Sequence, residues 1–383
     1  MKIGLRQSKD ICYNSLNYFL DSIEKELNDR GIETQRICDF NKDILTQKWD
    51  AIIGVNTNLP AIKMEDGKFF MDFFSCPVFD ILVDPPYYHH SILESHMNDL
   101  HIIVLDQGHV EYCEKYYTPF KSVEMAYLLG PAGNCKEYED KEIDILFSGS
   151  LPDEDEMKKQ AAQIYNAEWA DAIFELLIQI GKEQPDYTTH QAIETILKQS
   201  DIAYTDTELK LIMHNLGVCA EFYLRGYYRK KIITTLVDAG LRVHVAGNGW
   251  DKLYPECPEN LVLEGCLDFA EMADLTTNAK IVLNVMPWFK DGIHDRVLTA
   301  MMNGSVCVTD FSSYIDTHFE DGKELVIYRL NDIEALPGRI QELLHDDKTA
   351  KLIASRGKDK AVKNYSWGLF VENYILKHLL TEM

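Results

Sequence analysis

The sequence has few positive charges for its size. Its 383 residues include 38 Lys and Arg against 62 Asp and Glu, which gives a formal net charge of −24. Proteins that bind the phosphate backbone of nucleic acids present a basic face, so this balance argues against a nucleic-acid partner. A small anionic ligand remains compatible with it, because a few local cations and helix ends are enough to hold one.

Cysteine pairs and long apolar runs are also missing. The nine cysteines are scattered and include no Cys-x-x-Cys pair, which argues against a structural zinc site and favours reduced thiols in a cytoplasmic protein. No segment approaches the roughly 20 apolar residues that span a bilayer, and the N-terminus turns polar too early for a signal peptide. We therefore expect a cytoplasmic protein without a transmembrane segment.

The chain does contain a regular alternation of apolar strands and amphipathic helices. A hydrophobic fraction of 46% indicates a globular protein, and the length favours two domains. In residues 1–140, strands are expected at 2–5, 51–55, 78–84 and 101–106. Several end in Asp or Asn before a loop, which is typical of the carboxyl edge of an open parallel sheet, where ligands bind. This part is predicted to be a Rossmann-like domain.

A second domain of the same kind is predicted for residues 141–364. It opens with an apolar strand near 142–148, and further strands are expected at 241–246, 281–285 and 325–328. Residues 151–224 are charged and favour helix, so we interpret them as a helical insertion, after which a helix begins at Tyr228. The predicted fold class is α/β, with two doubly wound domains facing a cleft.

The segment from residue 290 to residue 310 is the most informative of the chain. Its apolar residues repeat on one face of a short helix, and Gly304 follows where a left-handed C-cap is wanted. The preceding loop brings Gly292, His294 and Arg296 to the N-terminus of this helix. Free backbone N–H groups and the helix dipole favour an anion there. The pattern predicts a site for a diphosphate.

Several short motifs occur in a fixed order around this segment. Phe147-Ser148-Gly149-Ser150 follows a strand, Tyr228-Arg229 opens a helix, and Gly247-Asn248-Gly249-Trp250 forms a turn. Leu283-Asn284 ends a strand that leads into the segment from Arg296 to Gly304. In this order they resemble the nucleotide-sugar-binding domain of GT-B glycosyltransferases, specifically the bacterial group-1, spore-maturation-type (CgeB-like) group. The resemblance covers about residues 142–375.

This resemblance implies a GT-B fold and a hexosyltransferase. The C-terminal domain would bind a nucleotide-diphosphate sugar, with a UDP-sugar first among them, and the N-terminal domain would face the acceptor. The sugar would move to an acceptor hydroxyl, on a protein or a surface glycan, without a metal or other cofactor and with retention of configuration favoured. Residues 365–383 would form the C-terminal helix that crosses back to the N-terminal domain.

The resemblance and the chemistry of the side chains together give the candidate site residues. Asp291, His294 and Arg296 are the catalytic candidates. An inverting enzyme would also need a base on the acceptor side, for which Asp84, His89 and His109 are candidates. The donor-binding candidates are Ser148, Gly149, Ser150, Arg229, Asn248, Gly249, Trp250, Asn284, Lys290, Gly292, Ile293, Asp295 and Thr299. For Trp250, packing in the core is the favoured alternative.

Thr299 departs from the family pattern. The family commonly has a glutamate at this position, which binds the donor ribose, and a threonine cannot accept two hydrogen bonds as a carboxylate does. Asp291, eight positions earlier, is acidic as in related retaining enzymes. Two alternatives to a transferase therefore stay open: a sugar-nucleotide epimerase on the same fold, and a non-catalytic nucleotide-sugar-binding protein.

Overall fold

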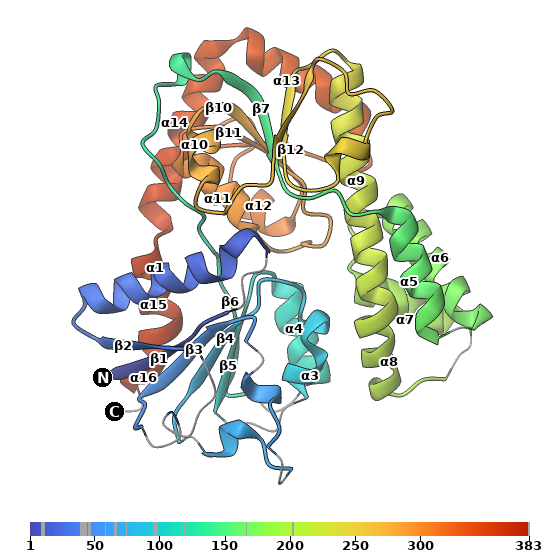
Figure 1. Cartoon of the computed structure of the whole chain (residues 1–383). Helices are drawn as coiled ribbons and strands as arrows, with labels where there is room; N and C mark the ends of the chain where they lie inside the picture. The colour runs from blue at the N-terminus through green and yellow to red at the C-terminus, as the bar shows by residue number, and fades with distance from the viewer. Residues whose placement is uncertain are drawn as a thin grey trace. The chain divides into compact units, whose positions relative to one another are not determined.

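The computed structural model divides into two compact units, residues 1–129 with residues 365–383, and residues 130–364 (Figure 1). The first boundary thus lies before residue 130, earlier than the predicted boundary after residue 140. The structure describes residues 1–8, 12–38, 44, 47–57, 59–64, 67–73, 75–94, 99–117, 120–165, 167–200 and 203–381.

The first unit is built on a six-stranded parallel sheet in the order β2-β1-β3-β4-β5-β6. Its strands are β1 (Lys2–Arg6), β2 (Glu33–Ile37), β3 (Ala51–Val55), β4 (Val78–Ile81), β5 (Leu100–Val104) and β6 (Ser122–Met125). The strand β3 is buried at every residue, as expected of a parallel strand covered on both faces. The α-helices described before its C-terminal segment are α1 (Ser15–Asp29), the single turn α3 (His90–Leu93) and α4 (Gln107–Tyr116).

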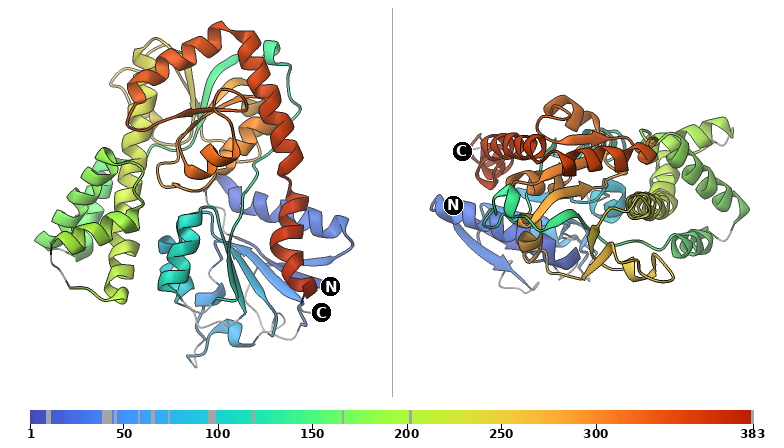
Figure 2. Two further views of the ribbon diagram at one scale, coloured as in Figure 1. Left: turned by 180° about the vertical axis from the view of Figure 1, so that it is seen from behind. Right: turned by 90° about the horizontal axis from the view of Figure 1, so that it is seen from above.

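The C-terminal residues pack on this first sheet, and Figure 2 shows their helix beside it from two further directions. The segment comprises α15 (Trp367–Val371), a π-helical turn (Glu372–Leu376) and α16 (Lys377–Thr381). Ser366 caps α15 by accepting a hydrogen bond from Leu369 N at 3.0 Å. On α16, Lys377 and His378 both contact the carboxylate of Glu124 on β6, at 2.7 and 2.5 Å. Charged contacts thus fix the last helix to an edge strand.

The second unit is also built on a six-stranded parallel sheet, in the order β12-β11-β10-β7-β8-β9. Its strands are β7 (Ile143–Ser148), β8 (Val243–Ala246), β9 (Leu261–Gly265), β10 (Ala279–Asn284), β11 (Val306–Asp310) and β12 (Val326–Tyr328). The chain moves outward from β7 to β9 and then returns to the other side of β7 with β10. The strand order therefore reverses between β7 and β10, and ligands of such sheets bind at the carboxyl ends of the strands at this point.

Helices cover the second sheet and enclose its core. The core joins residues of the central strands to those of α9 (Val218–Asp238), α13 (Leu336–His345) and α14 (Asp347–Asn364). The remaining helices of the α/β part are short: α10 (Met272–Thr277), α11 (Asp295–Met302) and α12 (Ser313–His318). The helix α11 begins close to its predicted start, after the loop that contains Gly292.

The predicted insertion is helical, but it does not end where the sequence suggested. It contains α5 (Glu154–Tyr165), α6 (Glu168–Glu183), α7 (Thr189–Gln199) and α8 (Asp206–Ile212). A π-helical turn at Met213–Gly217 joins α8 directly to α9, which runs without a break to Asp238. The helix predicted to begin at Tyr228 is therefore the second half of a longer one, because backbone hydrogen bonding continues through Gly217. Figures 1 and 2 show α5 to α7 gathered beside the continuous helix that α8 and α9 form.

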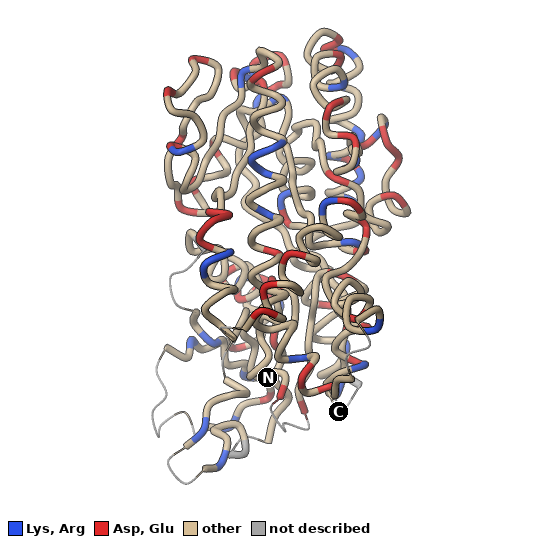
Figure 3. Tube along the Cα trace, turned by 90° about the vertical axis from the view of Figure 1, so that its right-hand side faces the viewer, with Lys and Arg blue, Asp and Glu red and all other residues tan. Residues whose placement is uncertain are grey.

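Within the described ranges, no helix is long and apolar enough to cross a membrane. Eight of the nine cysteines are recorded as free thiols: Cys38, Cys76, Cys113, Cys135, Cys219, Cys257, Cys266 and Cys307. Acidic side chains are spread along the whole trace rather than gathered in one segment (Figure 3). The negative charge of the chain is thus a property of its surface in general.

The packing of α14 gives a test of this fold. A Cβ atom at Gly357, in the buried face of α14, would meet the backbone carbonyl oxygen of Glu324, whereas one at Gly338 on α13 would meet nothing within 4 Å. We expect Gly357→Ala to destabilise the protein by about 1–3 kcal/mol through overpacking. The matched Gly338→Ala should stabilise it by about 0.5–1 kcal/mol, because alanine favours helix over glycine.

Urea denaturation of the two variants beside the wild type measures both effects. Equal changes in the free energy of unfolding at the two positions would contradict the described contact between α14 and the Glu324 carbonyl.

Candidate active site

The turns after β7 and β8 pack backbone against backbone. Gly247 and Gly249 both have positive φ angles, of 129° and 92°. A Cβ at Gly247 would lie 2.7 Å from the carbonyl carbon of Gly149, and one at Gly249 would lie 2.5 Å from the carbonyl oxygen of Leu151. Glycine is therefore required here by both conformation and space. The second turn supports the first and fixes the position of Ser148–Ser150.

Trp250 contributes to the same support. Its side chain is only 3% exposed, its Nε1–H donates to the Gly149 carbonyl at 2.8 Å, and its ring meets that of Phe147 edge-on with centroids 5.6 Å apart. These contacts describe a packing residue beneath the turn. Asn248 also faces protein groups, because its Oδ1 accepts from the thiol of Cys266 at 2.7 Å.

Arg296 joins the two strands at which the strand order reverses. Its Nε donates to Ser148 Oγ at 3.1 Å, at the end of β7, and its Nη1 donates to Asn284 Oδ1 at 2.6 Å, at the end of β10. Asn284 is fully buried, and its Nδ2 donates to Thr309 Oγ1 on β11 at 3.0 Å. The guanidinium is thus held at the ligand-binding edge of the sheet by residues from neighbouring strands.

Arg229 reaches the same place from α9. It is 5% exposed, and its Nη1 donates to the carbonyl oxygen of Ser150 at 2.6 Å. The guanidinium carbons of Arg229 and Arg296 lie 5.4 and 5.2 Å from the centre of the Phe147 ring. Two cations and the serine-glycine turn therefore converge at this edge of the sheet.

His294 caps the N-terminus of α11. Its Nδ1 lies 3.2 Å from the backbone N of Arg296 and 2.8 Å from the carboxylate of Asp295, and its ring packs against those of Trp288 and Phe289. Burial lowers the pKa of His294 below its ordinary value, and the neighbouring carboxylate of Asp295 opposes this shift. Burial alone would raise the pKa of Asp295, but His294 and Arg296 lower it. Asp295 is therefore ionised.

The segment before α11 is fixed mainly through its backbone. The carbonyl oxygen of Gly292 accepts from Ser312 Oγ at 2.7 Å, and that of Lys290 accepts from Ser313 N at 2.8 Å. Ile293 is fully buried, while Asp291 is half-buried.

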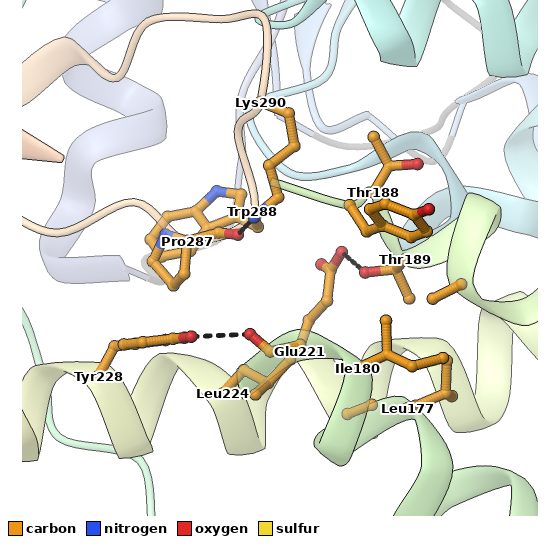
Figure 4. A pocket seen from close by; sticks show the side chains of 14 residues that line it. Leu177, Ile180, Thr188, Thr189, Glu221, Leu224, Tyr228, Pro287, Trp288 and Lys290 are labelled. Carbon is orange, nitrogen blue, oxygen red and sulfur yellow. Dashed lines mark hydrogen bonds between the residues drawn. The ribbon is translucent and has the colours of Figure 1, made fainter. Parts of the chain in front are cut away.

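Lys290 points to the helical insertion. Its ammonium group donates to the carbonyl oxygens of Pro185 and Pro287. Figure 4 shows it at one end of a pocket between α6, α7 and α9 on one side and Pro287–Lys290 on the other. Within this pocket, Thr189 Oγ1 donates to the carboxylate of Glu221 at 2.6 Å. The loop Pro287–Lys290, which precedes the candidate phosphate-binding residues, thus contacts the helical insertion.

Thr299 is occupied within its own unit. Its hydroxyl donates to the carbonyl oxygen of Asp295 at 2.7 Å and accepts from the backbone N of Gly130 at 2.8 Å. It is 8% exposed. Both hydrogen-bonding roles of the hydroxyl are therefore used by the backbone.

The acceptor-side candidates all belong to the first unit. Asp84 accepts from Asn56 Nδ2 at 3.2 Å, and His89 is half-buried at the end of a short 3-10 helix (Pro86–His89). Burial lowers the pKa of His109 to about 3, although the nearby charge of Asp84 opposes the shift. The structure thus brings His109 near Asp84 and leaves its imidazole a very weak base.

Two further residues of the site escaped the sequence prediction. Asp310, at the end of β11, is 1% exposed and accepts from Met286 N with both carboxylate oxygens, at 2.9 and 3.1 Å. Burial raises its pKa to about 7. Arg225 lies one helical turn before Arg229 on α9 and stacks on Trp288, with its guanidinium carbon 3.8 Å from the ring centre. Two features of the sequence could have identified these residues: an aspartate at the end of a predicted strand, and two arginines four residues apart on one predicted helix.

No group of three His, Cys, Asp or Glu side chains in the described part of the chain is arranged to hold a metal ion. The described residues that converge at the carboxyl edge of the second sheet include cations, hydroxyls and amides together with the carboxyls of Asp295 and Asp310.

Residues 229–375 match a family model described as glycosyl transferase-like. This match confirms the predicted class, a glycosyltransferase, for the part of the chain that it covers. No curated protein matches the sequence.

Solved structures share the fold over the whole chain. The T4 phage β-glucosyltransferase, described as a DNA-modifying enzyme and solved with and without uridine diphosphoglucose, is 14% identical with a TM-score of 0.56, over 98% of this chain and 99% of that chain. Anabaena HepE, solved in complex with UDP, is 10% identical with a TM-score of 0.54, over 100% of both chains. The predicted GT-B fold is therefore confirmed.

A third structure, S. aureus TarM, is 11% identical with a TM-score of 0.42. The match covers 78% of this chain and about half, 54%, of TarM.

The buried carboxyl of Asp310 predicts a pH dependence of stability. An aspartate in an unfolded chain has a pKa of about 3.9, whereas that of Asp310 in the fold is about 7. Between these values the unfolded state loses a proton that the folded state keeps, so the group's contribution to stability falls as pH rises from about 4 to about 7, by on the order of 4 kcal/mol. Asp310→Asn removes this titration, and the free energy of unfolding of the variant should decline less over this interval.

Chemical denaturation of the wild type and of Asp310→Asn at a series of pH values measures the free energy of unfolding of each. The contributions of the other carboxyls cancel in the difference between the two. Parallel curves would contradict the raised pKa of Asp310.

Proposed function

We propose that this chain transfers a sugar from a nucleotide-diphosphate sugar, with UDP as its nucleotide, to an acceptor hydroxyl. One observation carries the proposal: Arg296 is held between the ends of β7 and β10, beside Arg229 and at the N-terminus of α11. This is the place at which doubly wound sheets bind phosphates. The UDP and uridine diphosphoglucose bound by the two structural neighbours support UDP as the nucleotide.

The chemistry asked of this site is stabilisation of the leaving group. As the bond between sugar and diphosphate breaks, negative charge develops on the departing phosphate oxygen. Preorganised cations and backbone N–H groups stabilise such charge without reorganising during the reaction. Arg229, Arg296 and the first turn of α11 would supply these groups, so the proposed mechanism does not call for a metal ion.

The proposed reaction retains the configuration of the sugar, as the family resemblance implies. An oxygen of the leaving phosphate then takes the proton of the acceptor hydroxyl. The properties of His109 are consistent with this choice, because a histidine with a pKa of about 3 is too weak a base to activate a hydroxyl efficiently. A hydroxyl of a protein or a surface glycan is the proposed acceptor.

A second candidate function is binding of a nucleotide sugar without turnover. Thr299 favours it, since its hydroxyl is already engaged by Asp295 O and Gly130 N and offers no carboxylate to a ribose. The two functions differ in whether donor is consumed.

The donor site is tested by Arg296→Gln. Losing a charged hydrogen-bond donor to phosphate costs about 1.5–3 kcal/mol, so we expect UDP affinity to fall by about 10- to 100-fold. Isothermal titration calorimetry with UDP measures the change. The control is Arg356→Gln, an exposed arginine on α14, which should bind UDP as the wild type does. Equal affinity of the Arg296→Gln variant and the wild type would overturn the proposed site.

The reaction itself is tested by incubating the protein with UDP-sugars and following the anomeric proton by NMR. A transferase that retains configuration yields an α-linked product from an α-linked donor, or slowly releases the α-anomer when water is the acceptor. Release of the β-anomer would contradict retention. UDP binding with no consumption of donor under any acceptor would favour the second candidate.

A further inference from the structure

Three guanidinium groups of the second unit alternate with two aromatic rings. Arg225 lies on Trp288, with its guanidinium carbon 3.8 Å from the ring centre, and Arg229 lies 5.6 Å from the same ring. Arg229 and Arg296 both lie against Phe147, at 5.4 and 5.2 Å. We call Arg225, Trp288, Arg229, Phe147 and Arg296, in this order, the arginine row.

The three arginines differ in what they bind. Arg229 donates to the Ser150 carbonyl, and Arg296 donates to Ser148 and Asn284. Arg225 lies against two rings of the described chain, Trp288 at 3.8 Å and Phe222 at 4.6 Å. Its Nε and Nη2 are buried and have no hydrogen-bond acceptor among the residues that the structure describes. Two of the three guanidinium nitrogens of Arg225 therefore remain to be satisfied, whereas Arg229 and Arg296 are each held by a described acceptor.

Burying Nε and Nη2 without an acceptor is unfavourable, because three of the five N–H donors of the guanidinium then lose their contacts with water. Stacking on two rings offsets part of this cost, but rings do not accept the in-plane donors. Glu221, one turn earlier on α9, is engaged by Thr189. An anionic group of a ligand would complete the arrangement, and a carboxylate matches the planar fork of an arginine.

The order of the row fits the order of groups in a donor. Such a molecule runs from ribose through diphosphate to sugar. Thr299, where the resemblance places the ribose, lies one turn from Arg296 on α11. The diphosphate then meets Arg296 and Arg229, and the next cation along the row, Arg225, meets the sugar. The diphosphate of a nucleotide sugar carries two negative charges, which leaves the third cation of the row for a charge elsewhere on the donor.

We propose that Arg225 binds a carboxylate on the transferred sugar, and that the chain selects nucleotide-diphosphate hexuronic acids over neutral hexoses. This inference rests on the proposed donor site and names the chemical class of its sugar. Arg225 is in this scheme a specificity-determining residue. It touches the sugar and leaves the binding of the nucleotide unchanged.

Calorimetry with UDP, UDP-glucose and UDP-glucuronate tests the proposal without any acceptor present. We expect the wild type to bind UDP-glucuronate about 10-fold more tightly than UDP-glucose, as for one added charged hydrogen bond. Arg225→Gln should bring this ratio close to one while leaving the affinity for UDP unchanged, and Arg225→Lys, which keeps the charge, should restore part of the ratio. Circular dichroism establishes that both variants are folded.

The matched control is Arg329→Gln. Arg329 also stacks on a ring, that of Phe311 at 3.9 Å, but it is exposed and lies outside the arginine row. Its substitution should change neither affinity nor ratio.

The outcomes separate the two proposals. If the wild type binds UDP-glucuronate and UDP-glucose with equal affinity, the inference is overturned. This holds even if Arg225→Gln lowers transfer to an anionic acceptor, because Arg225 would then bind the acceptor and not the donor sugar. A ratio that persists in Arg225→Gln overturns it as well. In both cases UDP still binds and the proposed function stands. Should the nucleotide be GDP, GDP-mannose and GDP-mannuronate form the equivalent pair. If UDP, GDP and dTDP all fail to bind the wild type, the proposed donor site falls, and this inference with it.

Discussion

The placement of Arg296 is the constraint on which the rest of the second unit depends. A guanidinium that is partly removed from water needs acceptors for its donors, and here they come from the last residues of two strands, Ser148 on β7 and Asn284 on β10. Arg296 can bind both residues only because β7 and β10 end at the same level of the sheet and the side chains of Ser148 and Asn284 both point to its guanidinium group. Asn284 is positioned in turn by Thr309 on the next strand. The glycine turns after β7 and β8 then bring backbone, rather than side chains, up to the cation.

A local cluster of cations coexists with a strongly acidic chain. The net charge of −24 describes the surface, where Lys and Arg are mostly paired with or outnumbered by carboxylates. In the proposed donor site the hydrogen bonds of Arg229 and Arg296 go instead to carbonyl, hydroxyl and amide oxygens, which fix their geometry. The carboxyl groups of Asp295 and Asp310 also act on Arg296. Attraction for an anion depends on this local balance, because water and salt screen the distant carboxylates.

Much of the fold could be predicted from the sequence because it depends on local patterns. Residues 51–55 are apolar throughout, and residues 78–81 are apolar except for Asp80, which indicates buried parallel strands. The loop before α11 contains its glycine and its histidine cap. The start of α9 could not be predicted in this way. Gly217 looks like a place for a helix to stop, but the backbone passes through it in a π-helical turn. The contact between Thr299 and Gly130 was also beyond reach, since it joins residues 169 positions apart.

For the site, the sequence identified the residues in motifs and missed those that act through position alone. Arg229 was found because it follows a tyrosine at the expected place, whereas Arg225, one turn away, belongs to no motif. Lys290 is in the predicted segment, yet its charge is directed to the carbonyl of Pro185. Which way a long side chain turns depends on acceptors brought near by distant parts of the chain, and a linear pattern contains no information on that.

The continuity of α8, its π-helical turn and α9 has a mechanical consequence. One rod carries the insertion at its first end and both Arg225 and Arg229 at its middle, and α-helices resist bending over such lengths. A force applied to the insertion, by a bound macromolecule or by a crosslink, therefore cannot be absorbed in a loop before it reaches the cations. It tilts them together, and it also pulls on the donor loop through Lys290. The insertion is thus mechanically coupled to the carboxyl edge of the second sheet.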